Sequence, residues 1–394
     1  MSRTPGVLTK KLICLWIITA SSVGAIWCLA QVDAIVPDEL VLIWGLNPLA
    51  TPRPEIFAAL FGMGSVGIVC LIGNILLRLR DSDQTINLAS LLIALGAAGV
   101  AGYFVYEVLF NDEAAIPIIG QAEKLPAPVS GFRLFNLNVL HGYPDFAEQE
   151  QRMRDTAMLL RYLDPDVMVF QEVWSTNEHG NMAERLCMKG MAADRLSNTI
   201  DFNFAYARAN GSRSLIGFEE GAAIVSRFRL QSAKRLPLKP REPWWENRIA
   251  LVTRLDIGRD EALKLVSVHL SNSASADDQA EDLLEIVRGD APDIIVGDFN
   301  STPESRGVQV MLKGGFVEAI PTKAILGQKT FKLPNEKVAR PFIDHLFVSE
   351  GFLKKWEIVE AAWVLTSQAV TDDAVHGRMA VSDHDGLLVT IHRR

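Results

Sequence analysis

Ionisable and amide side chains recur at the ends of apolar stretches in the C-terminal two thirds of the sequence. Glu172 follows VMVFQ, His269 follows LVSV, and Asp298 and Asn300 follow IIVG. Such stretches are typical of buried strands, and active sites are commonly built where strands end. Carboxylates and amides suit Mg²⁺ and imidazoles suit proton transfer, so this set of side chains favours metal-assisted phosphoryl transfer.

Two further motifs lie near the C-terminus. Asp344 stands in FIDHLFVS, and Asp383 and His384 stand in VSDHDG, just before the last apolar stretch. Singly, each residue has an ordinary structural explanation, such as a solvated strand end, a turn or a helix cap. The combination is what indicates a site, and neither a G-x-S-x-G serine nor a Gly-rich Walker loop offers competing chemistry.

Periodicity predicts the elements that must position these side chains. FRLFNLNVL alternates apolar and polar residues as a half-buried strand does, so a globular domain is expected to begin near Phe132. Strands are expected at 132–140, 166–173, 221–226, 249–257, 262–270, 293–300, 342–349 and 386–392, and helices at 147–163, 181–196 and 276–288. Adjacent strands mix with strands separated by helices, which predicts mixed sheets with flanking helices.

The two ends of the chain differ in composition. Residues 1–130 contain seven of the 39 Lys and Arg residues, whereas residues 131–394 hold 32 basic and 37 acidic residues, enough for one large domain. This mild acidity weakens a nuclease interpretation without removing it, because non-specific DNA binding usually needs a basic surface. Only one of the four cysteines, Cys187, lies in this domain, which excludes a disulfide within it.

Three uncharged runs stand out in the N-terminal part, at 12–32, 56–77 and 84–106. Each is long enough for a helix that crosses a bilayer core, which takes about 20 residues. They predict a membrane anchor at 1–110, followed by a Pro- and Gly-containing linker at 111–131. The first run could instead be a cleaved signal peptide, although it exceeds the usual length of a signal's apolar region.

Flanking charge predicts the orientation of this anchor. Basic residues precede the first run and follow the second, at Arg3, Lys10, Lys11, Arg78 and Arg80. Positive residues stay on the cytoplasmic side, which predicts an integral protein of a bacterial inner membrane with its globular domain outside the cytoplasm. A shorter apolar run at 40–50 is expected to lie at the interface; if it crossed the bilayer, the domain would be cytoplasmic.

The chain from about 132 to 394 resembles the endonuclease/exonuclease/phosphatase superfamily, which includes DNase I, abasic-site endonucleases, neutral sphingomyelinases and inositol-polyphosphate phosphatases. The resemblance is carried, in order, by FNLNV, FQEV, EEGAAIVSR, VSVHL, GDFNSTPES, FIDHLFVS and SDHDG. GDFN followed by IDHLFVS and SDH in that spacing is the specific part. The resemblance implies a four-layer α/β sandwich, two mixed β-sheets flanked by helices, with a Mg²⁺ or Mn²⁺ site at one edge.

The resemblance also implies metal ligands. Glu172 would be the principal one, with Asn138 close to it and Asp383 contributing to the metal region. Some nuclease relatives carry an acid two residues after the first-motif Asn, whereas this chain has Leu140 there, so a second metal position is left open. The following His141 could face the site.

Roles in catalysis follow from the same resemblance. His384 would be the general base, oriented by Asp344, while Asp298 and Asn300 would position the attacking water and the phosphate. His269 would hydrogen-bond the phosphoryl oxygen and stabilise charge in the transition state.

Arg248, in WWENRIAL, sits where many members have an Arg, and it could contact the phosphate together with Asn300 and His269. The remaining histidines are expected at surface or core positions: His179, His345, His376 and His392.

These inferences predict a membrane-anchored, Mg²⁺- or Mn²⁺-dependent hydrolase of a phosphodiester or phosphomonoester. Trp244 and Trp245 could form an aromatic platform beside the site, or could pack against the core. An exposed pair on a domain held at a bilayer would favour a lipid headgroup, so lipid-linked or small-molecule substrates are placed ahead of nucleic acid. A DNase-type nuclease and a catalytically inactive membrane scaffold remain as alternatives, and no obligate protein partner is inferred.

Overall fold

The computed structural model describes eleven segments of the chain together with Gly99 and Gly102: residues 116–119, 129–141, 149–176, 180–186, 202–213, 218–241, 246–258, 261–319, 342–364, 369–373 and 377–394. The chain divides into two compact units, Met1–Asn111 with Gly211–Phe218, and Asp112–Asn210 with Glu219–Arg394. The second unit carries the predicted site and is described below.

The predicted membrane spans at 12–32 and 56–77 lie outside the described residues, as does the span at 84–106 except for its two glycines. Within the part of the chain that the structure describes, no helix combines the length and apolar composition needed to cross a bilayer. The three spans therefore stay predictions.

The larger sheet has the strand order β1–β5–β6–β3–β2–β16–β13, with β4 paired to β3. Its strands are β1 (Ile116–Ile119), β2 (Gly131–Asn138), β3 (Val167–Thr176), β4 (Gly180–Asn181), β5 (Asn203–Ser212), β6 (Phe218–Ser226), β13 (Trp356–Val364) and β16 (Gly386–Arg393). β2 runs parallel to β3 and antiparallel to β16, so the sheet is mixed. β1 falls within the predicted linker and pairs with β5.

The smaller sheet has the order β11–β12–β10–β9–β8–β7. Its strands are β7 (Arg229–Pro237), β8 (Ile249–Gly258), β9 (Glu261–His269), β10 (Ile294–Asp298), β11 (Phe316–Glu318) and β12 (Asp344–Ser349). β9 and β10 are parallel and β12 is antiparallel to β10, so this sheet is mixed as well. A separate pair, β14 (Ala369–Asp373) and β15 (Gly377–Ala380), forms a two-stranded sheet.

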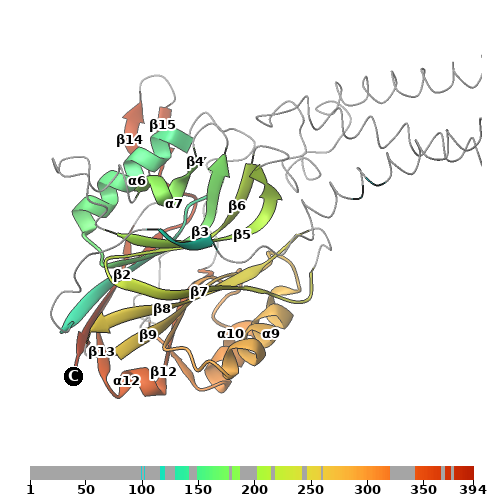
Figure 1. Ribbon diagram of the computed structural model, residues 1–394, viewed down its shortest axis with the longest axis vertical. Helices are drawn as coiled ribbons and strands as arrows, with labels where there is room; N and C mark the ends of the chain where they lie inside the picture. The colour runs from blue at the N-terminus through green and yellow to red at the C-terminus, as the bar shows by residue number, and fades with distance from the viewer. Residues whose placement is uncertain are drawn as a thin grey trace, which may run out of the picture. The chain divides into compact units, whose positions relative to one another are not determined.

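Helices cover the outer faces of the two sheets. Figure 1 shows α6 (Gln149–Leu163) and α7 (Met182–Arg185) beside the larger sheet, and α9 (Ala276–Arg288) and α10 (Arg306–Lys313) beside the smaller one. A short helix, α12 (Glu350–Leu353), connects β12 to β13. Two mixed sheets with flanking helices are consistent with the four-layer α/β sandwich that the sequence resemblance implies.

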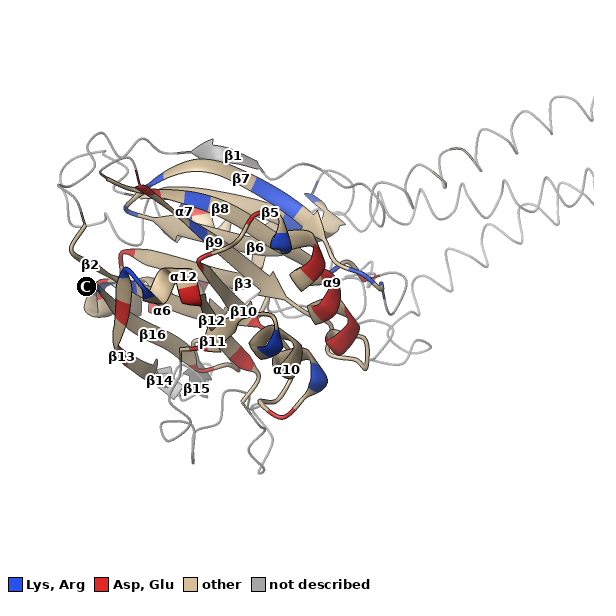
Figure 2. Ribbon diagram, turned by 90° about the horizontal axis from the view of Figure 1, so that it is seen from below, with Lys and Arg blue, Asp and Glu red and all other residues tan. Residues whose placement is uncertain are grey.

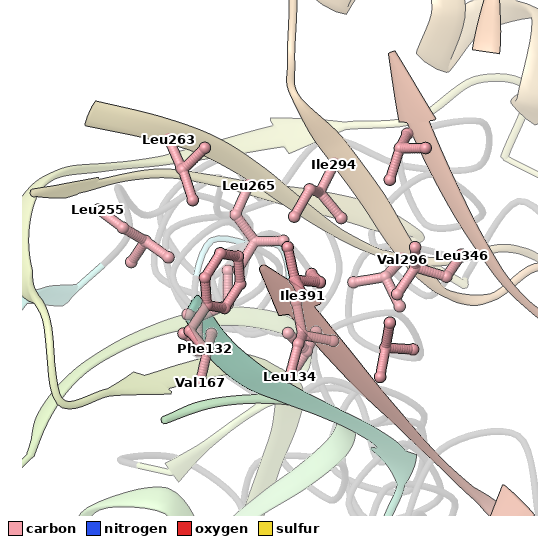
Figure 3. Packing of buried hydrophobic residues seen from close by; sticks show 14 of the residues in the cluster. Phe132, Leu134, Val167, Leu255, Leu263, Leu265, Ile294, Val296, Leu346 and Ile391 are labelled. Atoms are coloured by element: carbon pink, nitrogen blue, oxygen red, sulfur yellow. The ribbon is translucent and has the colours of Figure 1, made fainter. Parts of the chain in front are cut away.

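The main apolar core lies between the two sheets. Figure 3 shows side chains of β2, β3 and β16 meeting side chains of β8, β9, β10 and β12. Phe132 and Leu134 in β2 are 3% and 0% exposed, and they pack in the same cluster as Leu265 of β9. Burial of this many large apolar side chains is the main stabilising contribution to the two-sheet arrangement.

A second core holds α9 and α10 against the smaller sheet. Ala276, Ala280, Leu283 and Val287 recur at helical spacing along α9 and are all buried. They pack in one cluster with Val266 and other residues from the outward face of β8, β9 and β10. Both faces of β8, β9 and β10 are therefore covered where α9 and α10 lie.

The sequence expectation for β2 was wrong in one respect. Its alternation of apolar and polar residues predicted a half-buried strand, but the polar positions Asn136 and Asn138 are each only 1% exposed. They share the inward parity of Leu134 and so face the smaller sheet instead of solvent. Polar residues at these positions are thus part of the interior of the protein.

Candidate active site

Strand alternation carries three predicted residues into the space between the sheets. Inward positions are apolar over most of each strand, for example at Leu134, Leu265 and Val296. Two or four residues further along, the inward positions become polar, at Asn138, His269 and Asp298. The period of two that builds the core therefore also points these side chains toward one another at the end of the core.

Strand register brings the neighbours of Asp298 into line. In β10, Asp298 pairs with His269 of parallel β9 and with Asp344 of antiparallel β12. The carboxyl ends of β9 and β10 thus meet the first residue of β12, so three side chains from distant parts of the sequence share one edge of the smaller sheet.

A buried polar contact joins the two sheets just beneath this edge. Gln171 of β3 is 0% exposed, and its Nε2 donates to Asn136 Oδ1 at 3.0 Å and to Ser267 Oγ at 3.3 Å. Buried polar groups are costly unless they are hydrogen-bonded, so this contact specifies how the sheets meet. Sequence reasoning assigned Gln171 no role; its position directly before Glu172 was the only signal.

Glu172 departs from the alternation of its strand. The preceding Gln171 faces the other sheet, so Glu172 would point away in a regular strand, but its φ of 55° places it in the left-handed region. Its carboxylate accepts hydrogen bonds from Asn138 Nδ2 at 3.0 Å and from the His141 backbone N–H at 3.1 Å. Burial would raise the pKa of Glu172, but nearby His141 and His269 and these hydrogen bonds hold that pKa below its ordinary value.

Asp298 Oδ2 is the atom on which several side chains converge. It accepts from Asn138 Nδ2 at 3.1 Å, and lies 3.5 Å from His269 Nε2 and 3.7 Å from His384 Nε2. Burial and the neighbouring charge of Asp344 raise the pKa of Asp298 above its ordinary value. One carboxylate oxygen therefore lies between two imidazoles.

His384 is held by the carboxylate of Asp344. Its Nδ1 lies 2.8 Å from Asp344 Oδ2, and because an ionised carboxylate only accepts, Nδ1 carries the proton of this contact. Burial lowers the pKa of His384, but the charges of Asp344 and Asp298 outweigh burial and raise it to about 10. The backbone N–H of His384 also donates to Ser382 Oγ at 3.1 Å, and that hydroxyl donates to the carbonyl of Asn138.

His269 is kept neutral by its surroundings. Arg248 Nη1 lies 3.0 Å from its Nδ1 and 2.9 Å from its Nε2, and a guanidinium can only donate. The ring nitrogen that accepts must therefore be unprotonated. Burial and then the charge of Arg248 lower the pKa of His269 well below its ordinary value, which agrees with a neutral ring.

Arg248 is itself largely enclosed. It is 8% exposed, its Nη2 forms an ion pair with Glu246, and its buried Nε has no hydrogen-bond partner among the described residues. Within the described residues, the Arg248 guanidinium therefore contacts His269 and Glu246. A contact between Arg248 and a phosphate stays a prediction.

Asn300 adopts a left-handed backbone with φ of 47°. Its N–H donates to Asp298 Oδ1 at 2.8 Å, and its Nδ2 donates to the Leu270 carbonyl at 2.9 Å. Asn tolerates this region of φ better than most residues because its short polar side chain can bond locally. The Asp298 carboxylate is therefore held by a backbone N–H only two residues further along the chain.

Asp383 lies near these groups without a direct contact to Glu172. It is 6% exposed, and burial together with the charge of Glu172 raises its pKa above the ordinary value.

His141, which sequence reasoning treated only as a candidate, does face the Glu172 carboxylate: its Nε2 lies 3.6 Å from Glu172 Oε2. Its position two residues after the Asn138 motif was the available signal.

The other sequence candidates lie elsewhere. His345 is 0% exposed and so takes a core position, and His392 is exposed. Residues outside the described part of the chain are His179, His376, Trp244, Trp245 and Cys187.

Comparison with known proteins assigns the family. A profile of the Endonuclease/Exonuclease/phosphatase family matches residues 135–384, which include every candidate site residue named above. The chain belongs to this family. Members of the endonuclease/exonuclease/phosphatase family are generally hydrolases that act on phosphate esters, and they commonly use divalent metals such as Mg²⁺.

Several solved structures resemble this chain at low identity. A protein of this family from Beutenbergia cavernae is 19% identical with a TM-score of 0.49, covering 67% of this chain and 72% of that one. The human Nocturnin catalytic domain with bound sulfate is 17% identical with a TM-score of 0.47, covering 71% and 97%. A Bacteroides thetaiotaomicron member is 16% identical with a TM-score of 0.49, covering 66% and 97%. No curated protein matches the chain.

The donor set fits a hard divalent cation. Among the described residues, no three His, Cys, Asp or Glu side chains form a ready-made metal cage. Mg²⁺ does not require one, because it keeps several waters and is usually bound through one or two carboxylates. Glu172 and Asp298, which are bridged by the Nδ2 of Asn138, carry carboxylate oxygens of the kind that such a cation prefers.

Proposed function

We propose that this chain is a Mg²⁺- or Mn²⁺-dependent hydrolase of phosphate esters, held at a membrane by an N-terminal anchor at residues 1–110. The observation that carries the proposal is the convergence on Asp298 Oδ2 of Asn138, His269 and His384. Two imidazoles and a second carboxylate, that of Glu172, lie around one buried oxygen. This arrangement suits hydrolysis of a phosphate ester, in which the phosphate is bound, water attacks phosphorus and negative charge on the phosphoryl oxygens is stabilised.

Glu172 would be the principal metal ligand, supported by Asn138 and by the nearby Asp383. A bound cation would supply charge neutralisation at the phosphate. Two fixed hydrogen bonds orient the Glu172 carboxylate, from Asn138 Nδ2 and from the His141 N–H. The left-handed backbone at Glu172 turns it toward the group, so its placement is set before any ligand arrives.

His384 and Asp344 would handle the proton. Asp344 fixes the proton on Nδ1, which leaves Nε2 as the atom that accepts a proton from the attacking water. The oxygen of that water bonds to phosphorus, the ester P–O bond breaks, and the leaving oxygen takes up a proton from solvent, while His384 holds the proton that the water released and later returns it to solvent. Neutralising the charge of Asp298 lowers the pKa of His384, because the charge of Asp298, after that of Asp344, is one of those that raise it.

Asn300, Asp298 and His269 would position the water and the phosphate. A neutral His269 carries one ring N–H, which would donate to a phosphoryl oxygen once phosphate is bound, and Arg248 Nη1, at 3.0 and 2.9 Å from the two ring nitrogens, keeps the ring neutral. Such a donor stabilises charge that develops in the transition state. Arg248 would then act on the phosphate mainly through His269.

Lipid-linked or small phosphate esters are proposed as substrates ahead of nucleic acid. Figure 2 shows Lys and Arg on β7 and Asp and Glu on α9, so basic and acidic side chains gather on different elements of the described structure. The chain as a whole has a net charge of −8, which disfavours a general DNA-binding role. An anchored domain also meets lipid headgroups at high effective concentration.

The substrate class can be tested on the full chain with Mg²⁺ and, in parallel, with EDTA. Sphingomyelin vesicles, phosphoinositide vesicles and duplex DNA would each be incubated at matched phosphate concentration. Faster Mg²⁺-dependent hydrolysis of a lipid than of DNA supports the proposal. Preferential cleavage of DNA would reverse the order, and no turnover of any phosphate ester would favour an inactive scaffold.

The anchor and its orientation need a separate test. A reporter that is active only outside the cytoplasm, such as alkaline phosphatase, would be fused after Arg394, and a fluorescent protein that matures in the cytoplasm would serve as its counterpart. Activity of the first and no signal from the second are expected from the distribution of basic residues around the apolar runs. The opposite pattern would overturn the orientation.

A further inference from the structure

His345 follows Asp344 in β12, and its side chain lies on the opposite face of that strand. Alternation turns Asp344 toward His384 and turns the next residue to the opposite face of β12. There the ring is 0% exposed and is packed by three phenylalanines. Its centroid lies 5.6 Å from Phe299, 4.8 Å from Phe342 and 5.7 Å from Phe347.

Both ring nitrogens of this buried imidazole are used. Nε2 lies 2.7 Å from the carbonyl oxygen of Ser301, and Nδ1 lies 2.7 Å from Glu318 Oε1. A carbonyl oxygen can only accept, so Nε2 must carry a proton and donate it to Ser301. The other nitrogen is hydrogen-bonded to the Glu318 carboxyl group, so contacts at both nitrogens hold the orientation of the ring.

The carbonyl that receives this hydrogen bond belongs to the segment that forms the active-site turn. Ser301 follows Asn300, whose N–H holds Asp298 Oδ1 at 2.8 Å and whose backbone is left-handed. The turn is fixed on its other side by the Phe299 N–H, which donates to the Ile343 carbonyl at 3.0 Å. A displacement of Ser301 would therefore be transmitted through Asn300 to the carboxylate of Asp298.

We infer that His345 is a positioning residue, which clamps the Asp298–Ser301 turn to β12 while Glu318 of β11 fixes its ring. His345 touches neither Asp298 nor His384 in the described contacts, so it acts through the turn. The catalytic consequence rests on the proposed function, whereas the clamp itself does not.

A purely structural role would not need these two hydrogen bonds. An aromatic cage favours an apolar side chain, and burying a polar ring in it is costly unless each polar atom is satisfied. Phenylalanine would fill a similar volume without that requirement. The polar partners of His345 lie on two other segments of the chain, which is what a clamp between segments requires.

Amide hydrogen exchange of the full chain, in EDTA and without substrate, tests the clamp directly. The matched pair is His345→Phe, which keeps the aromatic packing and loses both hydrogen bonds, and Phe347→Leu, which perturbs the same cage and leaves the clamp intact. We expect amides of residues 299–302 to exchange roughly tenfold faster in His345→Phe and to be unchanged in Phe347→Leu. Equal exchange in the two variants would overturn the clamp.

A second pair keeps the test decisive if His345→Phe does not fold. Glu318 is part-exposed, so its substitution disturbs less of the interior. Glu318→Gln can still donate to Nδ1 and should leave residues 299–302 protected, whereas Glu318→Leu frees the ring and should speed their exchange. Identical protection in Glu318→Gln and Glu318→Leu would contradict the role of Glu318.

Turnover then tests the consequence of the clamp. The value of kcat/KM for Mg²⁺-dependent phosphate-ester hydrolysis should fall roughly 10- to 100-fold in His345→Phe and stay near wild type in Glu318→Gln and Phe347→Leu. If amide exchange changes in His345→Phe but the wild-type protein hydrolyses no phosphate ester, the clamp is supported and the proposed function is contradicted. Normal turnover in a His345→Phe variant with altered exchange would contradict the positioning role.

Discussion

Nδ1 of His384 lies 2.8 Å from Oδ2 of Asp344, although the two residues are 40 positions apart in the sequence. β12 begins at Asp344, and His384 stands just before β16, so each side chain is delivered from the end of a strand. The contact fixes the proton on one nitrogen and turns the other toward Asp298 at 3.7 Å. This pair is the acid–base element of the proposed mechanism.

Replacing either partner should therefore abolish most turnover. His384→Ala removes the proton acceptor, and Asp344→Asn can donate to Nδ1, which moves the ring proton to Nε2 and blocks proton uptake there. Each should lower kcat roughly 100- to 10,000-fold, and the double variant should lose little more because the two act as one unit. Steady-state kinetics checks this, with His392→Ala on the exposed end of β16 as the control. If the fold-decreases in kcat of the two single variants multiply in the double variant, the two residues do not act as one unit.

Metal binding should depend on Glu172. Glu172→Gln replaces one carboxylate oxygen by an NH₂ group, which then faces one of the two donors, either Asn138 Nδ2 or the His141 N–H. Isothermal titration with Mg²⁺ or Mn²⁺ should show at least roughly tenfold weaker binding. Glu360→Gln, at an exposed position of β13, is the control and should bind normally. Unaltered affinity in Glu172→Gln would place the cation elsewhere.

Glu220 makes stability depend on pH. Burial raises its pKa, with the charge of Glu172 adding to the rise, so the folded state holds this proton more tightly than the unfolded chain does. The stability contribution is complete below the unfolded pKa of about 4.3 and is lost as pH rises through the folded pKa. Glu220→Gln removes this loss and can still accept from Asn210.

Denaturant unfolding in EDTA from pH 4 to pH 8 measures this effect. The free energy of unfolding of Glu220→Gln, minus that of wild type, should grow as pH rises above about 4.3. Glu357→Gln, on the exposed edge of β13, should show no such trend. A difference that shrinks with rising pH would show that the sign is wrong.

Gln171 should contribute to stability by joining the sheets. Gln171→Leu leaves Asn136 Oδ1 and Ser267 Oγ without the donor that they share, at a depth where water is excluded. The free energy of unfolding should fall by about 1–3 kcal/mol. The same change at Gln231, which is exposed on β7, should have little effect. Equal unfolding midpoints for the two variants would mean that the buried contact adds nothing.

Long periodic elements could be predicted from the sequence. The helix predicted at 276–288 has the bounds of α9, because its apolar residues recur at helical spacing and acids open its first turn. The strands predicted at 249–257 and 262–270 agree with β8 and β9 within one residue. Of the helix predicted at 181–196, the structure describes α7 at Met182–Arg185, and the rest lies outside the described residues.

Other elements were missed for identifiable reasons. β7 is an edge strand whose sequence, RLQSAKRLP, is mostly polar, since only one of its faces packs on the protein. β13 is also an edge strand and exposes Val359, so its apolar residues do not form a continuous run. The predictions relied on apolar runs, which favour strands that are buried on both faces.

For the site, residue types could be predicted but geometry could not. Strand ends indicated His269 and Asp298, and period-two alternation explains why both face inward. Nothing in the local sequence gives the left-handed φ of Glu172, which redirects its carboxylate. The contact between Arg248 and His269 depends on how β8 and β9 pair, and the clamp at His345 depends on how β11, β12 and the turn after β10 come together.

Hydrolysis of bis(p-nitrophenyl) phosphate by the full chain is the sharpest test of the proposed activity, because it requires only the cleavage of a phosphate-ester bond. Wild type, His384→Ala and His392→Ala would be compared with Mg²⁺ and with EDTA. We expect hydrolysis that requires the metal, is lost in His384→Ala and is kept in His392→Ala. Hydrolysis that continues in EDTA, or that is equal in wild type and His384→Ala, would contradict it.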